Sequence, residues 1–275
     1  MRLSKRYIMK NKHLYPYLYC FFALFILLDA PAVRAQNEAY AKGVFITQQH
    51  DSMPYRLLAP QSLKSGKKYT LVLFLHGAGE RGSDNESQLR NGGTVFTNPV
   101  AREQYPCFVL FPQLGIKDYW SLAKRPAQGY KGANPLPKEV PITKHLQAVK
   151  ALLDKVIAEN PVDESRIYII GISMGAIATY DMVYRFPDRF AAAVAICGAT
   201  NIARMQELGG KTAFRLYHGD IDDVIPVRYS REAYEALHRK GRKVEYIEVY
   251  GAGHNAWHPA FNRPDFLSWL FKQKR

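Results

Sequence analysis

The sequence predicts an α/β protein, with a mostly parallel central sheet covered by helices on both faces. Short apolar runs typical of buried strands alternate with amphipathic helical segments. Residues 69–75 (YTLVLFL) form a nearly continuous apolar run, as expected of a strand buried on both faces. Residues 167–176 (IYIIGISMGA) have the pattern of a strand, a Gly-x-Ser-x-Gly turn and the start of a helix.

The first 35 residues are expected to be a signal peptide. Basic residues precede a short apolar core at 20–28, and small residues lead to a predicted cleavage after Ala35. The core is shorter than the roughly 20 residues that cross a bilayer, so an uncleaved membrane anchor is the alternative. Bulky Tyr19 argues against lipid attachment at Cys20. Residues 36–275 are predicted to form a single catalytic domain, periplasmic or secreted.

The expected elements of this domain begin with an antiparallel hairpin at one edge of the sheet, formed by 43–48 and 54–58. Residues 77–98 and 113–141 are rich in turn-forming residues and are expected to be irregular, and 80–100 and 113–141 are predicted to form the pocket walls. Further strands are predicted at 69–75, 107–111, 167–171, 191–197, 213–217 and 244–249, and helices at 142–156, 176–186, 229–239 and 261–271.

Charge and cysteine content exclude some classes of protein. The chain without residues 1–35 has 32 basic and 23 acidic residues, a net charge of +9, but the basic residues are dispersed and form no nucleic-acid motif. Cys107 and Cys197 lie in apolar strand-like runs and are expected to be small core residues. An exported protein allows a bridge between them, and their spacing predicts no metal site.

Ser173, at the centre of the Gly-x-Ser-x-Gly turn, is the candidate nucleophile. A sharp turn between strand and helix exposes the hydroxyl, and glycines avoid collisions with the neighbouring elements. The pattern alone would occur by chance in roughly one chain of this length in ten. The prediction therefore depends on an acid and a base elsewhere in the chain.

Loops after two later strands supply these partners. An acidic loop with Asp220, Asp222 and Asp223 follows 213–217, and any of the three could instead form a turn or cap. His254 follows the last strand in a glycine-rich loop. Sites in parallel sheets gather at the carboxyl ends of strands, so we expect these side chains to meet. The chain order is serine, acid, histidine.

Two backbone N–H groups are expected to form an oxyanion hole. One belongs to Met174, directly after the nucleophile. The second is assigned to Ala78, in the small-residue loop HGAGERG that follows the 69–75 strand. His76, at the start of that loop, is expected to be structural.

Four segments together resemble the α/β-hydrolase superfamily. These are LHGAGERG (75–82), GISMG (171–175), HGDIDDVIP (218–226) and GAGH (251–254). They are similar to the dienelactone hydrolase, phospholipase/carboxylesterase and feruloyl-esterase-like branches, over residues 68–272. The resemblance implies the α/β-hydrolase fold, a triad of Ser173, Asp222 and His254, and an oxyanion hole at Ala78 and Met174. The FPQ stretch and the tryptophan after it imply that Gln113 and Trp120 lie near the substrate.

The sequence thus predicts an exported serine hydrolase that cleaves carboxylic esters through an acyl-enzyme, without metal or organic cofactor. The expected partner is a small-molecule or polysaccharide-linked ester, such as a feruloyl or acetyl ester, and no nucleic acid. Membrane contact is expected only through an uncleaved leader. A serine peptidase or an acyltransferase on the same fold is an alternative, and a non-catalytic surface binding protein is an alternative of another class.

Overall fold

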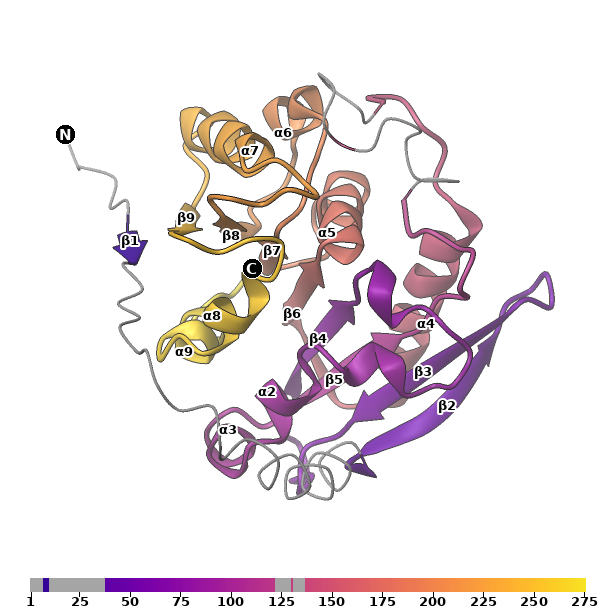
Figure 1. Ribbon diagram of the computed structural model, residues 1–275. Helices are drawn as coiled ribbons and strands as arrows, with labels where there is room; N and C mark the ends of the chain where they lie inside the picture. The colour runs from indigo at the N-terminus through magenta and orange to yellow at the C-terminus, as the bar shows by residue number, and fades with distance from the viewer. Residues whose placement is uncertain (1–6, 10–37, 122–129, 131–136) are drawn as a thin grey trace, which may run out of the picture.

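A nine-stranded sheet forms the centre of the molecule (Figure 1). The computed structural model describes residues 7–9, 38–121, 130 and 137–275. Adjacent strands are parallel except at one edge, where β2 and β3 form a hairpin and β3 pairs antiparallel with β5. The strands, in sheet order, are β1 (Tyr7–Met9), β9 (Val244–Val249), β8 (Ala213–Gly219), β7 (Ala192–Ile196), β6 (Val162–Ile172), β4 (Tyr69–Leu75), β5 (Cys107–Pro112), β3 (Ser52–Leu58) and β2 (Tyr40–Ile46).

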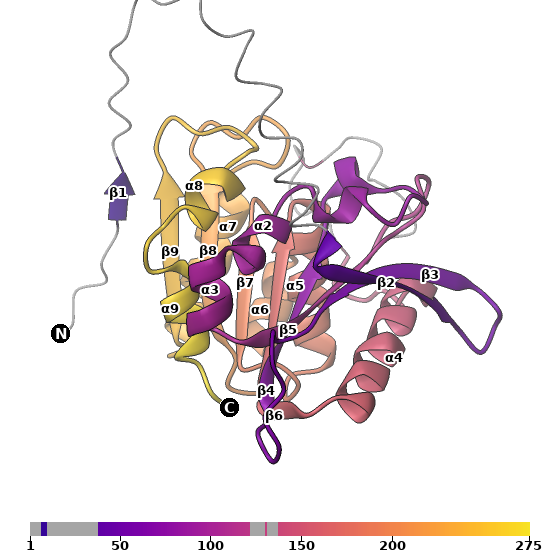
Figure 2. The same ribbon diagram turned by 90° about the horizontal axis from the view of Figure 1, so that it is seen from below.

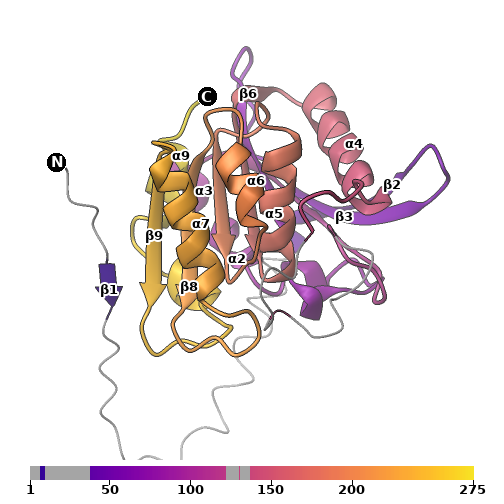
Figure 3. The same ribbon diagram turned by 90° about the horizontal axis from the view of Figure 1, so that it is seen from above.

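Helices cover both faces of this sheet, as Figures 2 and 3 show. Because side chains alternate along a strand, β4 sends Leu71 and Leu73 into the core beneath one helical layer and Val72 and Phe74 into the core beneath the other. One layer contains α4 (Lys144–Glu159), α5 (Met174–Arg185), α6 (Ile202–Glu207) and α7 (Arg228–Arg239), and the other contains α2 (Gly93–Thr97), α3 (Pro99–Gln104), α8 (Trp257–Phe261) and α9 (Phe266–Phe271).

This architecture confirms the predicted α/β-hydrolase fold, with its antiparallel hairpin at one edge. The predicted strand at 69–75 is β4 and that at 244–249 is β9, with the same bounds. Among the described helices, none has the length and apolar character that crossing a membrane requires. Of the predicted signal peptide, the structure describes only β1, which lies parallel to β9.

Several expected elements differ from the structure. The helix expected at 261–271 is wrong in its extent: α8 ends at Phe261, and α9 begins at Phe266. Pro264 lies between them and disfavours helical geometry in the residue before it. The expected irregular stretch 77–98 contains the 3-10 turns η1 (Ala78–Glu80) and η2 (Ser87–Leu89) as well as α2. Of the expected loop 113–141, residues 122–129 and 131–136 lie outside the described residues.

Candidate active site

Ser173 occupies the single residue between β6 and α5. Its φ is 51° and its ψ −116°, a region that L-residues rarely adopt, and the turn therefore stores strain of about 1–3 kcal/mol. Neither flanking glycine could carry a side chain, because a Cβ atom would collide with neighbouring backbone. A Cβ on Gly171 would lie 2.1 Å from the Gly175 carbonyl oxygen, and a Cβ on Gly175 would lie 1.9 Å from that of Leu75. The close approach of β4, β6 and α5 thus places the half-buried serine at the end of the sheet.

The structure brings together the three residues that the sequence singled out. Ser173 Oγ lies 2.7 Å from His254 Nε2, and His254 Nδ1 lies 2.7 Å from Asp222 Oδ2. The Asp222 loop follows β8 and the His254 loop follows β9, at the same end of the sheet. The two loops pack so closely that a Cβ on Gly219 would lie 2.1 Å from the Ala252 carbonyl oxygen.

Asp222 is held as an ionised acceptor. Burial alone would raise its pKa, but hydrogen bonds from His218 and His254, and from the backbone of Ile225, hold the pKa well below its usual range. Oδ1 accepts the N–H groups of Val224 and Ile225, both at 2.9 Å. Because an ionised carboxylate only accepts, His254 must donate from Nδ1, which leaves Nε2 to accept the serine proton.

The structure also separates Asp222 from its neighbours in the acidic loop. Asp220 Oδ1 accepts the N–H of Gly251 and so serves the turn after β9. Asp223 is exposed. His218 is fully buried between Ser230 Oγ, the Ile225 carbonyl and Asp222 Oδ2, the last at 3.2 Å. Of the three carboxylates that the sequence left open, Asp222 alone has a recorded contact with His254.

The predicted oxyanion-hole residues lie beside the nucleophile. A Cβ on Gly77 would lie 3.5 Å from Ser173 Cβ, which places the turn Ala78–Glu80 against the serine. Among the described residues, no acceptor bonds to the backbone N–H of Ala78 or of Met174. Two unpaired donors therefore flank Ser173, as an oxyanion requires.

His76 orients the first of these donors. Its Nε2 accepts the Leu114 N–H at 3.1 Å, so the ring proton is on Nδ1, which donates to the Gly77 carbonyl at 2.6 Å. The Gly77 carbonyl and the Ala78 N–H belong to one planar peptide and point in opposite directions. Holding the carbonyl therefore fixes the direction of the N–H. Burial lowers the pKa of His76 to about 4, so the ring is neutral at pH 7.

Gln113 and Trp120 were predicted to lie near the substrate, and the structure places both behind the loop that begins at His76. Gln113 is buried; its amide donates to Asp84 at 2.7 Å and accepts the Asn85 N–H at 2.8 Å. Trp120 is also buried, and its Nε1 donates to the His76 carbonyl at 3.0 Å. Both residues brace the loop from behind, and their contact with substrate stays a prediction.

Cys197 is a neighbour of the triad that the sequence did not indicate. Both Cys107 and Cys197 are free and buried, as expected of core residues. The Cys197 sulfur and ligand atoms of Asp222 and His254 all lie within 4.8 Å of one another. Burial raises the pKa of Cys197 to about 12, so it is a neutral thiol and a poor metal ligand. With the acid and the imidazole hydrogen-bonded to each other, the cluster fits a triad with a packed thiol better than a metal site.

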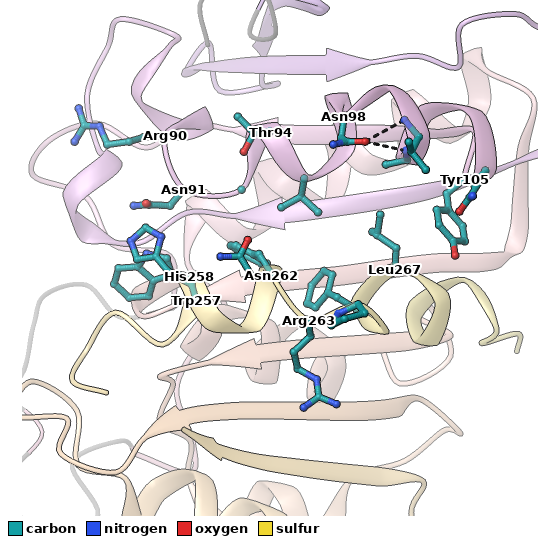
Figure 4. A pocket seen from close by; sticks show the side chains of 18 residues that line it. Arg90, Asn91, Thr94, Asn98, Tyr105, Trp257, His258, Asn262, Arg263 and Leu267 are labelled. Atoms are coloured by element: carbon teal, nitrogen blue, oxygen red, sulfur yellow. Dashed lines mark hydrogen bonds between the residues drawn. The ribbon is translucent and has the colours of Figure 1, made fainter. Parts of the chain in front are cut away.

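A groove of about 640 Å³ lies between α2–α3 and α8–α9 (Figure 4). One end contains Asn91, Trp257 and His258. The Trp257 ring packs edge-on against His254, with 5.7 Å between ring centroids. The lining combines amide, guanidinium and aromatic side chains and includes no carboxylate. The groove therefore begins next to His254 and suits a polar, uncharged or anionic group.

Comparison with known proteins agrees with this geometry. The family model for phospholipase/carboxylesterase matches residues 126–264. Acyl-protein thioesterase 1 homolog 1 of Dictyostelium discoideum is 23% identical over 195 residues, which are 67% of this chain and 83% of that protein. A thermostable esterase structure superposes with a TM-score of 0.77 at 32% identity, over 88% of this chain and 64% of that one. A ferulic acid esterase structure superposes with a TM-score of 0.64 at 18% identity, over 84% of this chain and 98% of that one.

The fold and these matches show that the protein is a serine ester hydrolase of the carboxylesterase/thioesterase type with the α/β-hydrolase fold. More particularly, the chain belongs to the phospholipase/carboxylesterase family. The chain spans 64% of the length of the thermostable esterase, so that protein includes sequence with no counterpart in the match.

Proposed function

We propose that Ser173, His254 and Asp222 hydrolyse carboxylic esters through an acyl-enzyme. The observation that supports this proposal is the continuous hydrogen-bonded chain from Ser173 Oγ through His254 to Asp222, with 2.7 Å at each step. His254 Nε2 takes the serine proton as Oγ attacks the ester carbonyl, and the imidazolium then protonates the leaving alcohol. Asp222 fixes the required tautomer and stabilises the imidazolium.

The backbone N–H groups of Ala78 and Met174 stabilise the negative charge that develops on the carbonyl oxygen. Both N–H groups are unpaired among the described residues and so are available to donate hydrogen bonds to that oxygen. Water, activated by His254, then attacks the acyl-enzyme and returns Ser173 to its free form. No step of this sequence requires a metal or an organic cofactor.

We further propose that the enzyme is exported and removes acyl groups from polysaccharides. The basic, apolar and small-residue pattern of residues 1–35 supports export. The groove beside Trp257, with its amide and aromatic lining, supports a substrate that extends beyond the ester bond through a hydroxyl-rich alcohol. Cell fractionation tests export, with N-terminal sequencing of the product. A mature N-terminus at residue 36 is expected, and retention of the full chain in the cytoplasm would contradict export.

A substrate panel tests the reaction class and the substrate. Purified wild-type protein is compared with Ser173→Ala on p-nitrophenyl acetate, a palmitoyl thioester, a peptide amide, methyl ferulate and acetylated xylan. The proposal predicts hydrolysis of the simple ester by wild type alone, and a higher kcat/KM on xylan-linked or feruloyl esters than on the thioester. Preference for the thioester would favour the activity named for the Dictyostelium relative, and cleavage of the amide alone would favour a peptidase.

A further inference from the structure

Glu80 is a buried acid directly behind the predicted oxyanion hole, and nothing in the mechanism above uses it. Its side chain is 5% exposed. No salt bridge joins it to a basic side chain in the part of the chain that the structure describes. Burying a carboxyl group without a paired cation is costly. The groups that contact the Glu80 carboxyl group therefore indicate its role in the loop.

Those partners belong to the oxyanion loop and to the segment before α2. Asn91 Nδ2 donates to Glu80 Oε1 at 2.8 Å. Oε2 lies 3.0 Å from the position of a Cβ on Gly77, so the carboxyl group fills the inside of the turn. Burial raises the pKa of Glu80, while the hydrogen bond from Asn91, the backbone at Gly77, the positive charge of Arg90 and the backbone at Glu80 act in the opposite direction.

We propose that Glu80 and Asn91 are positioning residues that lock the 77–80 turn, so that the Ala78 N–H faces the substrate oxyanion. This inference rests on the proposed function of the loop. The Glu80 carboxyl group lies against Gly77 on the inside of the turn, and the Asn91 amide holds that carboxyl group in place.

Two other contacts hold the same loop from outside. Arg81 Nε donates to the Ala78 carbonyl at 2.9 Å, and Gln113 Nε2 lies 3.4 Å from the Glu80 carbonyl. These contacts hold carbonyl groups from outside, whereas the Glu80 carboxyl group fills the inside of the turn against Gly77. Loss of the Glu80 carboxyl group leaves the bond from His76 to the Gly77 carbonyl without support from inside the turn, so the direction of the Ala78 N–H becomes less well fixed. Asn91 also lies at the end of the groove near Trp257 and His258 (Figure 4), so the lock can be reached from the surface.

Glu80→Gln and Asn91→Ala test the proposal, with Glu86→Gln as the matched control. Glutamine has one acceptor oxygen where the carboxylate has two, so it cannot accept both from Asn91 Nδ2 and from the turn, and alanine removes the donor that fixes Glu80. Glu86 lies in the same stretch, but its carboxylate is exposed and pairs with Lys42. With p-nitrophenyl acetate we expect kcat to fall about 10- to 100-fold in both test variants, with KM within twofold of wild type and the control unchanged.

Inhibition by a trifluoromethyl ketone distinguishes a role in the oxyanion hole from a purely structural role, which would leave the inhibition constant unchanged. Its adduct with the serine places an oxyanion in the hole, so its inhibition constant should rise by about the same factor as kcat falls. Unchanged kcat and inhibition constant in Asn91→Ala would overturn the proposal, and so would a loss explained by KM alone. Asn91→Ala decides the question if Glu80→Gln fails to fold. Failure of wild-type Ser173 to react with a fluorophosphonate would instead overturn the proposed function.

Discussion

His76 offers a matched pair of substitutions that separates its two hydrogen bonds. Asparagine places its NH₂ group near the position of Nδ1 and can still donate to the Gly77 carbonyl. Glutamine places its amide near the position of Nε2 and can still accept the Leu114 N–H, but it loses the bond to Gly77. If the Gly77 contact aims the Ala78 N–H, the two variants should differ in activity while both lose stability.

The expected changes in kcat and in unfolding free energy follow from the contacts of His76. His76→Gln should lower kcat about 10- to 100-fold more than His76→Asn, since loss of a whole oxyanion donor costs about 10²–10³. His76→Asn leaves the buried Leu114 N–H without its acceptor and removes packing against Trp120, whose ring centroid lies 5.1 Å away. Each variant should therefore lose about 2–4 kcal/mol of unfolding free energy.

The pH dependence of the unfolding free energy tests the buried, neutral state of His76 independently. The pKa of His76 is lowered from 6.5 to about 4 in the folded protein, so the unfolded chain takes up the proton first. The stability that this ring contributes is complete above pH 6.5 and is lost as the pH falls towards 4, by about 2–3 kcal/mol at pH 4.5. Both variants lack the imidazole and should show a correspondingly smaller loss between pH 7 and pH 4.5.

Urea unfolding at the two pH values and steady-state kinetics at pH 7.5 are the assays. Equal kcat in the asparagine and glutamine variants would refute the role of the Gly77 contact. If the unfolding free energy falls as much between pH 7 and pH 4.5 in the variants as in wild type, His76 is not the buried group that causes the loss.

Two further predictions concern the nucleophile and the acid. Asp222→Asn should lower kcat about 10³- to 10⁴-fold with unchanged circular dichroism, because the amide can donate to Nδ1 and so favours the wrong tautomer of His254; a loss below tenfold would contradict the assigned acid. Ser173→Gly should abolish activity and raise the unfolding free energy by about 1–2 kcal/mol, because glycine adopts the observed φ of 51° without strain. A destabilised Ser173→Gly in urea unfolding would show that the turn is not strained.

Much of this fold can be predicted from the sequence, because its signals are local. The apolar run of β4 and the strand, turn and helix around Ser173 depend on near neighbours in the chain. Helix ends in the second helical layer were harder to predict. The pattern across 261–271 looks continuous, and only the geometry around Pro264 divides it.

The site could be predicted in outline but not in its supporting contacts. The positions of Asp222 and His254 follow from where their strands end. That Gln113 and Trp120 point inwards depends on how the 113–121 segment packs behind His76, which no local pattern shows. The position of the Glu80 carboxyl group likewise depends on a hydrogen bond from Asn91, eleven residues away along an irregular stretch.

Labelling with a fluorophosphonate tests the central claim most directly. Intact-mass and peptide analysis of the treated protein should find one adduct, on Ser173, with loss of esterase activity in step with labelling. Ser173→Ala should keep its fold, remain unlabelled and show no turnover of p-nitrophenyl acetate. An adduct on another residue, or esterase activity that persists in Ser173→Ala, would contradict the assignment of Ser173 as the nucleophile.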